Sequence, residues 1–408
     1  MKIAILGFGV VGSGVAEVLK TNKSQITKKA GQEIEIKYIM DLRDFAGEPF
    51  EHLMTKDFGA IENDPEVEVV VESIGGDTIA YEYTKRALLS GKNVCTPNKA
   101  LIAKHGAELF SIAKERGVHI LFEASVGGGI PLIRPYNDAL LTDEVEEVSG
   151  ILNGTSNYIL TQMMNGTSYE NALKDAQELG YAEQDPTADV GSFDACRKLA
   201  IMLSLAVNKQ VNYEEIKTEG IQEINSEDFA FAKALGFTLK QLVNGSIRKN
   251  GVEALAAPFL IPLSHPLASV NDVFNGVWVR GKTTGNIMLY GSGAGKLPTA
   301  SAVVTNIVDI AAANCLPCTW TSDKANILPT STYAKRKAIR ASFENANAIS
   351  AVKSAIGAET VSLPDYPNTI AWLTPLETEA QTAQTLEVIK RFPGFKSIER
   401  VMRVYNAE

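Results

Sequence analysis

The chain begins with a short apolar run that stops at glycines, followed by a stretch whose apolar residues recur with helical spacing. The run Ile3–Leu6 leads into Gly7, Gly9 and Gly12, and the periodic stretch continues to Leu19. This order predicts a strand, a tight turn and a helix. A dinucleotide site has the same layout, because the three glycines permit the turn, a close approach of the backbone to a pyrophosphate and tight packing of helix on strand. A tight turn without a ligand is the alternative.

Apolar and polar segments continue to alternate up to residue 123. The pattern predicts strands at 33–40, 67–71, 93–96 and 119–123, with helices at 81–89 and 105–116 between the later ones. Strands that alternate with helices form a parallel sheet with helices on both faces. The fold class predicted for this part is therefore α/β, a Rossmann-type doubly wound sheet.

The pattern changes after Val126, where three glycines and Pro131 predict a corner. The region 131–285 shows the mixed strands and helices of an α+β domain. A second glycine-rich stretch, 291–295, leads through Pro298 into a predicted helix at 300–313, which favours an anion at the helix N-terminus. The segment 335–405 has the order βαββαβ, a ferredoxin-like unit that binds effectors or pairs subunits.

Composition narrows the classes of protein. A chain of 408 residues, 45% of them hydrophobic, is long enough for two or three domains. No apolar stretch reaches the roughly 18 to 20 residues of a membrane span, and the first strand leaves no room for a signal peptide, so we expect a cytoplasmic protein without a membrane partner. The net charge of -9 argues against a nucleic-acid partner.

Cysteine and histidine offer little catalytic chemistry. Cys315 and Cys318 form a CxxC, which is half of a zinc site or a redox pair, but the other two cysteines and the four histidines supply no ligand-spaced second half. His105 is predicted to begin a helix and His265 precedes a proline, so both are expected to be structural or surface groups. We therefore expect no metal or redox role for the CxxC.

An acidic residue stands at the end of the second predicted strand. Asp41 is placed to accept hydrogen bonds from the adenosine ribose hydroxyls of NAD, and its charge repels the 2′-phosphate of NADP. Arg43, two residues later, offsets part of that repulsion.

Six segments of the chain, in the same order as in the family, resemble homoserine dehydrogenase. The resemblance covers residues 1 to 313, and the GYAExDPTxDV pattern followed by Asp194 and Lys198 is specific to that family. The segments are GFGVVGSG (7–14), TPNK (96–99), FEASVGGGIP (122–131), ILNGTSNY (151–158), GYAEQDPTADVGSFDACRK (180–198) and GSGAGKLPTAS (291–301).

The resemblance implies an activity and a domain plan. The activity is NAD- or NADP-linked interconversion of L-homoserine and L-aspartate 4-semialdehyde, in threonine, methionine and isoleucine biosynthesis, by a homodimer or homotetramer. The plan is a dinucleotide-binding and dimerisation region at 1–130 and about 286–330, a substrate domain at 131–285 and an ACT-like domain at 331–408.

Two departures from the family pattern affect the expected cofactor preference and the expected binding of an effector. Met40 stands where many NADP-preferring members carry arginine, so NAD or dual use is expected. The helix-start loop 343–348 lacks the glycine of the usual DxPG effector signature. An oligomerisation role for the C-terminal domain is therefore at least as expected as threonine binding.

The resemblance also assigns the catalytic groups. Oxidation of a primary alcohol needs a base for the hydroxyl proton while hydride leaves for the nicotinamide, and Lys198 is the candidate if burial or neighbouring cations lower its pKa. Lys99 would approach from the cofactor domain and polarise the carbonyl oxygen. Asp194 lies four residues before Lys198, so the two share a helix face. The spacing alone favours a solvated surface ion pair, and the resemblance reverses that preference.

Substrate, cofactor and cation contacts follow in the same way. Glu183 would meet the substrate ammonium group with help from Asp189, although neighbouring Asp185 reads as a helix cap followed by Pro at the first helical position. Thr155, beside Gly154, would hold the carboxylate, and Tyr181 completes the substrate contacts. The cofactor contacts are Gly7, Phe8, Gly9, Val10, Val11, Gly12, Asp41, Arg43, Lys99, Gly291 and Gly293. A monovalent cation such as sodium would be held by Glu123, Val126, Gly128 and Ile130, in a corner that equally describes a plain hinge.

Two alternatives to this enzyme stay open. One is a non-catalytic NAD-binding metabolite sensor, and the other is a dehydrogenase of a related amino-acid semialdehyde. A sensor has no need to keep Glu183, Asp194, Lys198 and Lys99 together. The volume of the substrate pocket decides between homoserine dehydrogenase and the related semialdehyde dehydrogenase.

Overall fold

The structure is a computed structural model that describes the chain except residues 46, 48, 138–141, 358 and 406–408. It divides into two compact units. Unit 1 comprises Met1–Glu146, Arg197–Glu214 and Val279–Asn326, and unit 2 comprises Glu147–Cys196, Glu215–Trp278 and Ile327–Glu408. None of the helices in the described part of the chain is both long enough and apolar enough to cross a membrane.

Unit 1 is built on a parallel sheet with the strand order β3-β2-β1-β4-β5-β6. This is the order of dinucleotide-binding folds, in which the direction of winding reverses between the first and fourth strands. The prediction of a doubly wound α/β sheet is confirmed. The strands are β1 (Lys2–Leu6), β2 (Glu35–Met40), β3 (Met54–Thr55), β4 (Val67–Glu72), β5 (Asn93–Cys95) and β6 (Ile120–Leu121).

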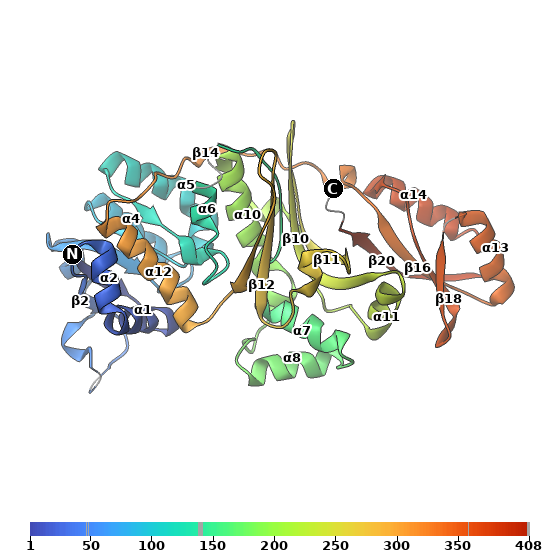
Figure 1. The fold of residues 1–408 in the computed structure, drawn as a ribbon, viewed down its shortest axis with the longest axis horizontal. Coiled ribbons are helices and arrows are strands. Elements are labelled where there is room, and N and C mark those ends of the chain that lie inside the picture. Colours follow the sequence, from blue (N-terminus) through green and yellow to red (C-terminus); the bar gives the residue numbers. More distant parts are fainter. Residues whose placement is uncertain (46, 48, 138–141, 358, 406–408) are drawn as a thin grey trace. The chain divides into compact units, whose positions relative to one another are not determined.

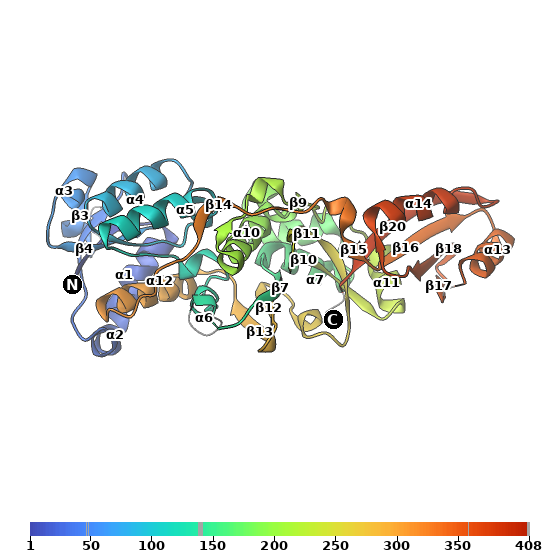
Figure 2. The same cartoon turned by 90° about the horizontal axis from the view of Figure 1, so that it is seen from above.

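Helices cover both faces of this sheet (Figures 1 and 2). One face carries α1 (Val10–Thr21), α2 (Lys23–Ala30) and α12 (Lys296–Ala311), and the other carries α3 (Phe58–Glu62), α4 (Ile79–Leu89) and α5 (Lys99–Arg116). Side chains of α1, α12 and the central strands share one apolar core, which includes Ile5, Val15 and Val303. The segment that carries α12 thus packs in the same unit as the first glycine turn.

Three helices with predicted bounds, α4, α5 and α12, begin earlier than predicted. The helix predicted at 105–116 starts at Lys99, because the side chain of Asn98 accepts the backbone N–H of Leu101 (3.1 Å). His105 therefore lies inside α5, where its ring stacks on Tyr81 with centroids 4.1 Å apart. Likewise α12 starts before the predicted residue 300, and α7 (Gly154–Met164) starts directly after its own asparagine cap, Asn153. Asparagine caps are local signals that the apolar periodicity does not contain.

The strands of unit 2 form a mixed sheet that extends into the C-terminal segment. The central strands β10 and β11 form a long antiparallel hairpin, and β20 pairs in parallel with β11 through Phe259↔Arg403 and Leu260↔Val404. The order is β13 (Gly285–Ser292), β12 (Phe274–Gly281), β7 (Val145–Ile151), β10 (Phe237–Arg248), β11 (Gly251–Pro262), β20 (Phe395–Val404), β16 (Lys337–Phe343), β18 (Tyr366–Leu373) and β17 (Thr360–Leu363).

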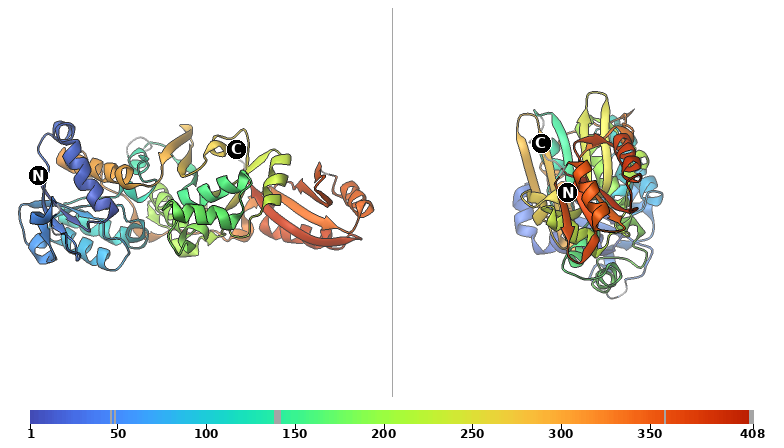
Figure 3. Two further views of the ribbon diagram at one scale, coloured as in Figure 1. Left: turned by 90° about the horizontal axis from the view of Figure 1, so that it is seen from below. Right: turned by 90° about the vertical axis from the view of Figure 1, so that its right-hand side faces the viewer.

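The helices of unit 2 pack in two groups. The first group is α7, α8 (Tyr169–Glu178), α9 (Thr187–Val190), the start of α10 (Phe193–Val207) and α11 (Ser226–Ala234). The second is α13 (Ala346–Ile356) and α14 (Glu379–Ile389), which lie beside β16 and β18 (Figures 2 and 3). The apolar core between these helices and strands includes Phe343 and Trp372. The βαββαβ order predicted for 335–405 is confirmed.

One apolar core joins the middle of the chain to its C-terminal strands. It contains Ile159 and Leu160 of α7, Leu260 of β11, and Met402 and Val404 of β20. The C-terminal strands are therefore part of the packing of unit 2. The predicted division into a cofactor region, a substrate domain and an ACT-like domain stays a prediction.

Candidate active site

The glycine turn after β1 is shaped as a close backbone approach requires. Gly7 has φ +87°, and a Cβ there would lie 2.7 Å from the carbonyl oxygen of Ser73. A Cβ at Gly12 would lie 2.0 Å from the carbonyl oxygen of Gly7, whereas one at Gly9 would meet no heavy atom within 4 Å. Gly9 caps α1 without a side-chain hydrogen bond. The helix N-terminus thus faces open space beside Gly9, as a phosphate site needs.

Asp41 at the end of β2 is held from two sides. Its carboxylate accepts the backbone N–H of Phe8 (2.7 Å) and a two-pronged contact from Arg43, with Nε at 3.0 Å and Nη2 at 2.8 Å. The hydrogen bonds from Arg43 hold the pKa of Asp41 well below its usual range. The side chain that was predicted to bind the ribose is therefore engaged by the arginine that was predicted to offset its charge.

The second glycine-rich stretch lies against the corner at residues 127–130. A Cβ at Gly128 would lie 2.5 Å from the carbonyl oxygen of Gly293, and a Cβ at Gly291 would lie 3.2 Å from the side chain of Ile130. Gly129 donates its N–H to the carbonyl of Ser292 (3.1 Å). The close contact explains why both segments are glycine-rich.

Glu123 is buried and hydrogen-bonded within unit 1. Its carboxylate accepts the backbone N–H groups of Leu132 (2.6 Å), Ile133 (2.9 Å) and Arg134 (2.9 Å) at the start of α6 (Ile133–Asn137). Burial raises its pKa, and these hydrogen bonds oppose the rise. The carboxylate thus caps a helix, and a cation at Glu123, Val126, Gly128 and Ile130 would depend mainly on the backbone carbonyls. That site stays a prediction.

The turn that carries Lys99 is fixed by a buried carboxylate that the sequence analysis missed. Glu72, at the end of β4, accepts the hydroxyl of Thr96 (2.6 Å) and the backbone N–H of Ile74 (2.8 Å). Asn98 donates its amide to the carbonyl of Gly76 (2.6 Å) and caps α5. Lys99 is the first residue of that helix. The valine-rich sequence of β4 gave no sign that the glutamate at its end would be fully buried.

A second missed residue, Asn153, organises the carboxylates of unit 2. Its Nδ2 donates to Asp189 (2.7 Å) and to Asp194 (3.0 Å), while its Oδ1 accepts the backbone N–H of Ser156 (2.8 Å) and caps α7. Asn153 is 5% exposed and Asp194 is 6% exposed. The Asn-Gly-Thr-Ser sequence ahead of an apolar helix was the available signal, since asparagine is a preferred N-cap.

Asp194 and Lys198 lie one turn apart on α10, which confirms the predicted helix. Lys198 is 8% exposed, so neither side chain is the solvated surface group of the alternative reading. Asp194 lies in the first turn of the helix, where the backbone dipole stabilises a negative charge. The predicted approach of Lys99 toward Lys198 stays a prediction.

The remaining predicted substrate residues lie in unit 2. Thr155 donates its hydroxyl to the carbonyl of Tyr181 (2.6 Å), and the Tyr181 ring packs edge-on to Tyr158. Glu183 is exposed. Asp185 accepts from the backbone N–H of Thr187 (3.1 Å), but the helix α9 begins at Thr187, so the expectation of Pro186 at the first helical position is wrong by one residue.

Within the described residues, the CxxC forms neither a disulfide nor part of a metal-ligand cluster. Cys315 and Cys318 are both free thiols, and burial raises the pKa of each to about 11. No group of three or more His, Cys, Asp or Glu in the described part of the chain is arranged to hold a metal ion.

The sheet order, the glycine turn at a helix N-terminus and the carboxylate at the end of β2 define a dinucleotide-binding protein. Asp194 and Lys198 on α10 are buried titratable side chains, which are candidates for acid–base chemistry. With a dinucleotide site in the same chain, they favour the class of dinucleotide-dependent oxidoreductases.

Comparison with known proteins identifies the family. Residues 7–123 match the family model "Homoserine dehydrogenase, NAD binding domain", and residues 131–308 match "Homoserine dehydrogenase". A homoserine dehydrogenase of Bacillus subtilis (strain 168) is 42% identical over 318 residues, which is 76% of this chain and 72% of the relative.

Solved structures agree. A homoserine dehydrogenase from Thiobacillus denitrificans superposes with TM-score 0.90 at 32% identity, covering 100% of this chain and 98% of that chain. A hyperthermophilic archaeal homoserine dehydrogenase in complex with NADPH superposes with TM-score 0.64 at 26% identity, covering 78% and 99%.

The chain belongs to the homoserine dehydrogenase family. The predicted activity is confirmed: it is an NAD(P)-dependent oxidoreductase that interconverts L-homoserine and L-aspartate 4-semialdehyde. The metabolite sensor and the dehydrogenase of another semialdehyde are not favoured.

Proposed function

We propose that Lys198 is the proton-transfer residue of this reaction and that Asp194 orients it. The observation that carries the proposal is the Asn153 bridge, which fixes Asp189 and Asp194 immediately ahead of Lys198. When NAD(P) is bound, its nicotinamide accepts or gives the hydride. During oxidation the neutral amine of Lys198 takes the hydroxyl proton, and during reduction its ammonium form returns a proton to the carbonyl oxygen.

Substrate recognition follows from the charges of unit 2. Glu183 meets the substrate ammonium group, and Asp189 assists it. The backbone N–H groups of Gly154 and Thr155 lie in the first turn of α7, where the helix dipole attracts the substrate carboxylate. Because the Thr155 hydroxyl donates to Tyr181, it contributes to the carboxylate site through its backbone and holds the Tyr181 loop in place.

The cofactor is NAD or NADP, with dual use as our proposal. The glycine turn and the Gly291–Gly293 stretch supply the phosphate contacts, and the Arg43–Asp41 pair decides the preference. With the pair intact, Arg43 neutralises the carboxylate that would repel a 2′-phosphate. The archaeal relative that binds NADPH supports this part of the proposal.

Two further features complete the proposal. A sodium ion would lie at the carbonyls of the 126–130 corner, which is tested by comparing activity in sodium and potassium buffers. The chain would act as a homodimer or homotetramer, with residues 1–130 and about 286–330 binding the cofactor and residues 131–285 binding the substrate. Light scattering after gel filtration measures the assembly.

The catalytic roles are tested by replacing Lys198. We expect Lys198→Ala to lower kcat by on the order of 10²-fold or more, the usual contribution of a general acid–base group. Absorbance of NADH or NADPH with L-homoserine or aspartate semialdehyde measures the rate. The matched control is Arg197→Ala, which removes a cation from the next position of α10, where Arg197 packs on Tyr213. A Lys198→Ala enzyme that keeps near-parental kcat would refute the role of Lys198.

A further inference from the structure

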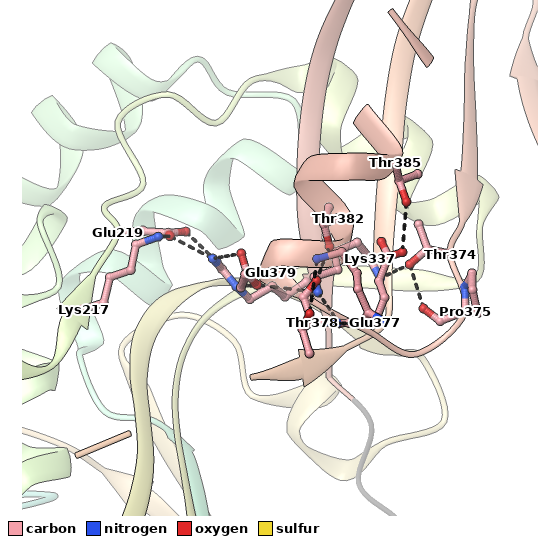
Figure 4. Close-up of polar contacts among 12 residues, drawn as sticks. Lys217, Glu219, Lys337, Thr374, Pro375, Glu377, Thr378, Glu379, Thr382 and Thr385 are labelled. Atoms are coloured by element: carbon pink, nitrogen blue, oxygen red, sulfur yellow. Dashed lines mark hydrogen bonds and ion pairs between the residues drawn. The ribbon is translucent and has the colours of Figure 1, made fainter. Parts of the chain in front are cut away.

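Arg403 of β20 connects two carboxylates that are far apart in the chain. It is 9% exposed and donates to Glu219 from Nη1 (2.7 Å) and Nη2 (3.1 Å). It also donates to Glu379 at the start of α14, from Nε (2.9 Å) and Nη2 (3.2 Å). Lys217 makes a further ion pair with Glu219 at 2.8 Å (Figure 4). All of these residues belong to unit 2.

The backbone of Glu219 extends this network toward α10. Its N–H donates to the carbonyl of Ala256 on β11 (2.8 Å), and its carbonyl accepts the hydroxyl of Ser192 (2.9 Å) and the amide of Gln241 (3.0 Å). Gln241 also donates to the hydroxyl of Ser192. The side chain of Glu219 is thus held by Arg403 while its backbone holds the residue that precedes α10.

The next residues of the same segment contact the chain just ahead of Ser192. Ile221 donates its N–H to the carbonyl of Val190 (2.9 Å), and a Cβ at Gly220 would lie 2.6 Å from that carbonyl oxygen. Residues 219–221 therefore pack directly along residues 190–192. A larger residue than glycine at 220 would push the two segments apart.

Ser192 has a backbone conformation that its surroundings must maintain. Its φ is +70°, a left-handed value that residues other than glycine rarely adopt. Its carbonyl accepts the N–H of Cys196 (2.9 Å), so the orientation of Ser192 sets the first turn of α10, and Asp194 follows two residues later. A strained residue of this kind persists only where neighbouring contacts fix it.

We propose that Arg403 is a positioning residue for the dehydrogenase reaction. Arg403 fixes the side chain of Glu219, and the backbone carbonyl of Glu219 fixes Ser192. Through this chain of contacts Arg403 sets the direction of the first turn of α10, and with it the positions of Asp194 and Lys198. This inference rests on the roles proposed above for Asp194 and Lys198. The role is not catalytic, because Arg403 acts through two intervening residues.

The ionisation of the pair supports this geometry. Burial raises the pKa of Glu219, but the hydrogen bonds and charges of Arg403 and Lys217 outweigh that effect, so its pKa is lowered overall. Glu219 is therefore a carboxylate at neutral pH. The two-pronged contact with Arg403 restrains direction as well as distance, which a single lysine contact would not do.

The test compares Arg403→Met, Glu219→Gln and Ser192→Ala with the parent enzyme. Each variant is expected to lower kcat by roughly 10-fold, since small displacements of aligned groups have effects of that order or larger. The pH profile of kcat/KM is expected to shift, because Asp194 and Lys198 change their alignment. Arg403→Lys restores one contact and recovers part of the rate. The double variant Arg403→Met/Ser192→Ala is expected to match the single variants, since both break one chain of contacts.

The control is Arg248→Met, which removes an arginine paired with Glu253 (3.1 Å) at the end of the β10–β11 hairpin in the same unit. Its kcat should stay within about twofold of the parent value, as for most surface ion pairs. Ser192→Ala removes no charge, so it carries the test if Arg403→Met does not fold.

Parental kcat and an unchanged pH profile in Ser192→Ala and in Arg403→Met would overturn the inference, even if the melting temperature fell. Near-parental activity of Lys198→Ala would instead refute the proposed catalytic roles. The two failures are therefore distinguishable.

Discussion

The glycine turn allows binding to be separated from folding by two substitutions of the same size. Gly9→Ala and Gly12→Ala each add one methyl group within the same turn. A Cβ at residue 12 would lie 2.0 Å from the carbonyl oxygen of Gly7 and 2.9 Å from the hydroxyl of Ser73, whereas one at residue 9 meets nothing within 4 Å. We therefore expect Gly12→Ala to impair folding and Gly9→Ala to impair cofactor binding.

The distances around Gly12 set the size of the expected loss of stability in Gly12→Ala. Carbon and carbonyl oxygen normally stay about 3.3 Å apart, so the turn must open by roughly 1 Å. Overpacking of this kind costs about 1 to 3 kcal/mol or more, and the better helix propensity of alanine returns up to about 1 kcal/mol. A net loss on the order of 2 kcal/mol lowers the melting temperature of a domain of this size by about 4 to 8 °C.

Gly9→Ala should leave the melting temperature nearly unchanged. Replacing a glycine cap by alanine costs about 0.5 to 1 kcal/mol, and the smaller entropy of the unfolded chain offsets a similar amount. In the bound state the methyl group occupies the space that the phosphate needs. Loss of one charge-assisted hydrogen bond, about 1.5 kcal/mol, weakens NADPH binding roughly tenfold.

Thermal unfolding followed by circular dichroism without cofactor, and titration of NADPH fluorescence, measure the two effects. The reasoning is refuted if Gly9→Ala melts as early as Gly12→Ala while binding NADPH with parental affinity. It is equally refuted if Gly12→Ala keeps the parental melting temperature.

Three further predictions concern other parts of the molecule. Asn153→Ala removes two contacts to carboxylates and a helix cap, so the urea-unfolding free energy should fall by on the order of 3 kcal/mol and kcat should fall too, whereas Asn165→Ala at the exposed end of α7 should change neither appreciably. Arg43→Gln frees Asp41 for the ribose hydroxyls, so the ratio of kcat/KM with NADH to kcat/KM with NADPH should rise, and an unchanged ratio would contradict the proposed pair. Burial lowers the pKa of Lys240 from 10.5 to about 8. Between pH 8 and 10.5 the unfolded chain therefore binds more protons than the folded chain, and the unfolding free energy of the parent should rise with pH. Lys240→Met lacks this contribution, so its unfolding free energy should rise less over the same range. Equal pH dependence of the two urea midpoints would argue against that pKa.

Local signals made much of the fold and part of the site predictable. The glycine turn, the valine-rich β4 and the four-residue spacing of Asp194 and Lys198 each depend on neighbours in sequence. Helix starts were predicted less well, because Asn98 and Asn153 fix them through side-chain caps that apolar periodicity does not contain.

The contacts that orient the site were not predictable in this way. Glu72 and Thr96 meet because β4 and β5 are neighbours in the sheet. The pairing of β11 with β20 brings Arg403 to Phe259, and leaves no mark in the sequence near either strand. Parallel pairing between distant segments depends on the completed fold, whereas the family resemblance could point to Lys198 without explaining what holds it.

The pairing of β20, the last strand of the chain, with β11 has a consequence for folding during synthesis. During synthesis the hairpin of β10 and β11 emerges long before its partner strand, so the backbone groups of β11 that later bond β20 stay open for that whole interval. Open strand edges are templates for pairing with other chains, and sheets that close through distant segments fold slowly. The nascent enzyme is thus most exposed to aggregation after its catalytic residues are translated and before β20 emerges, a period in which chaperone binding should be strongest.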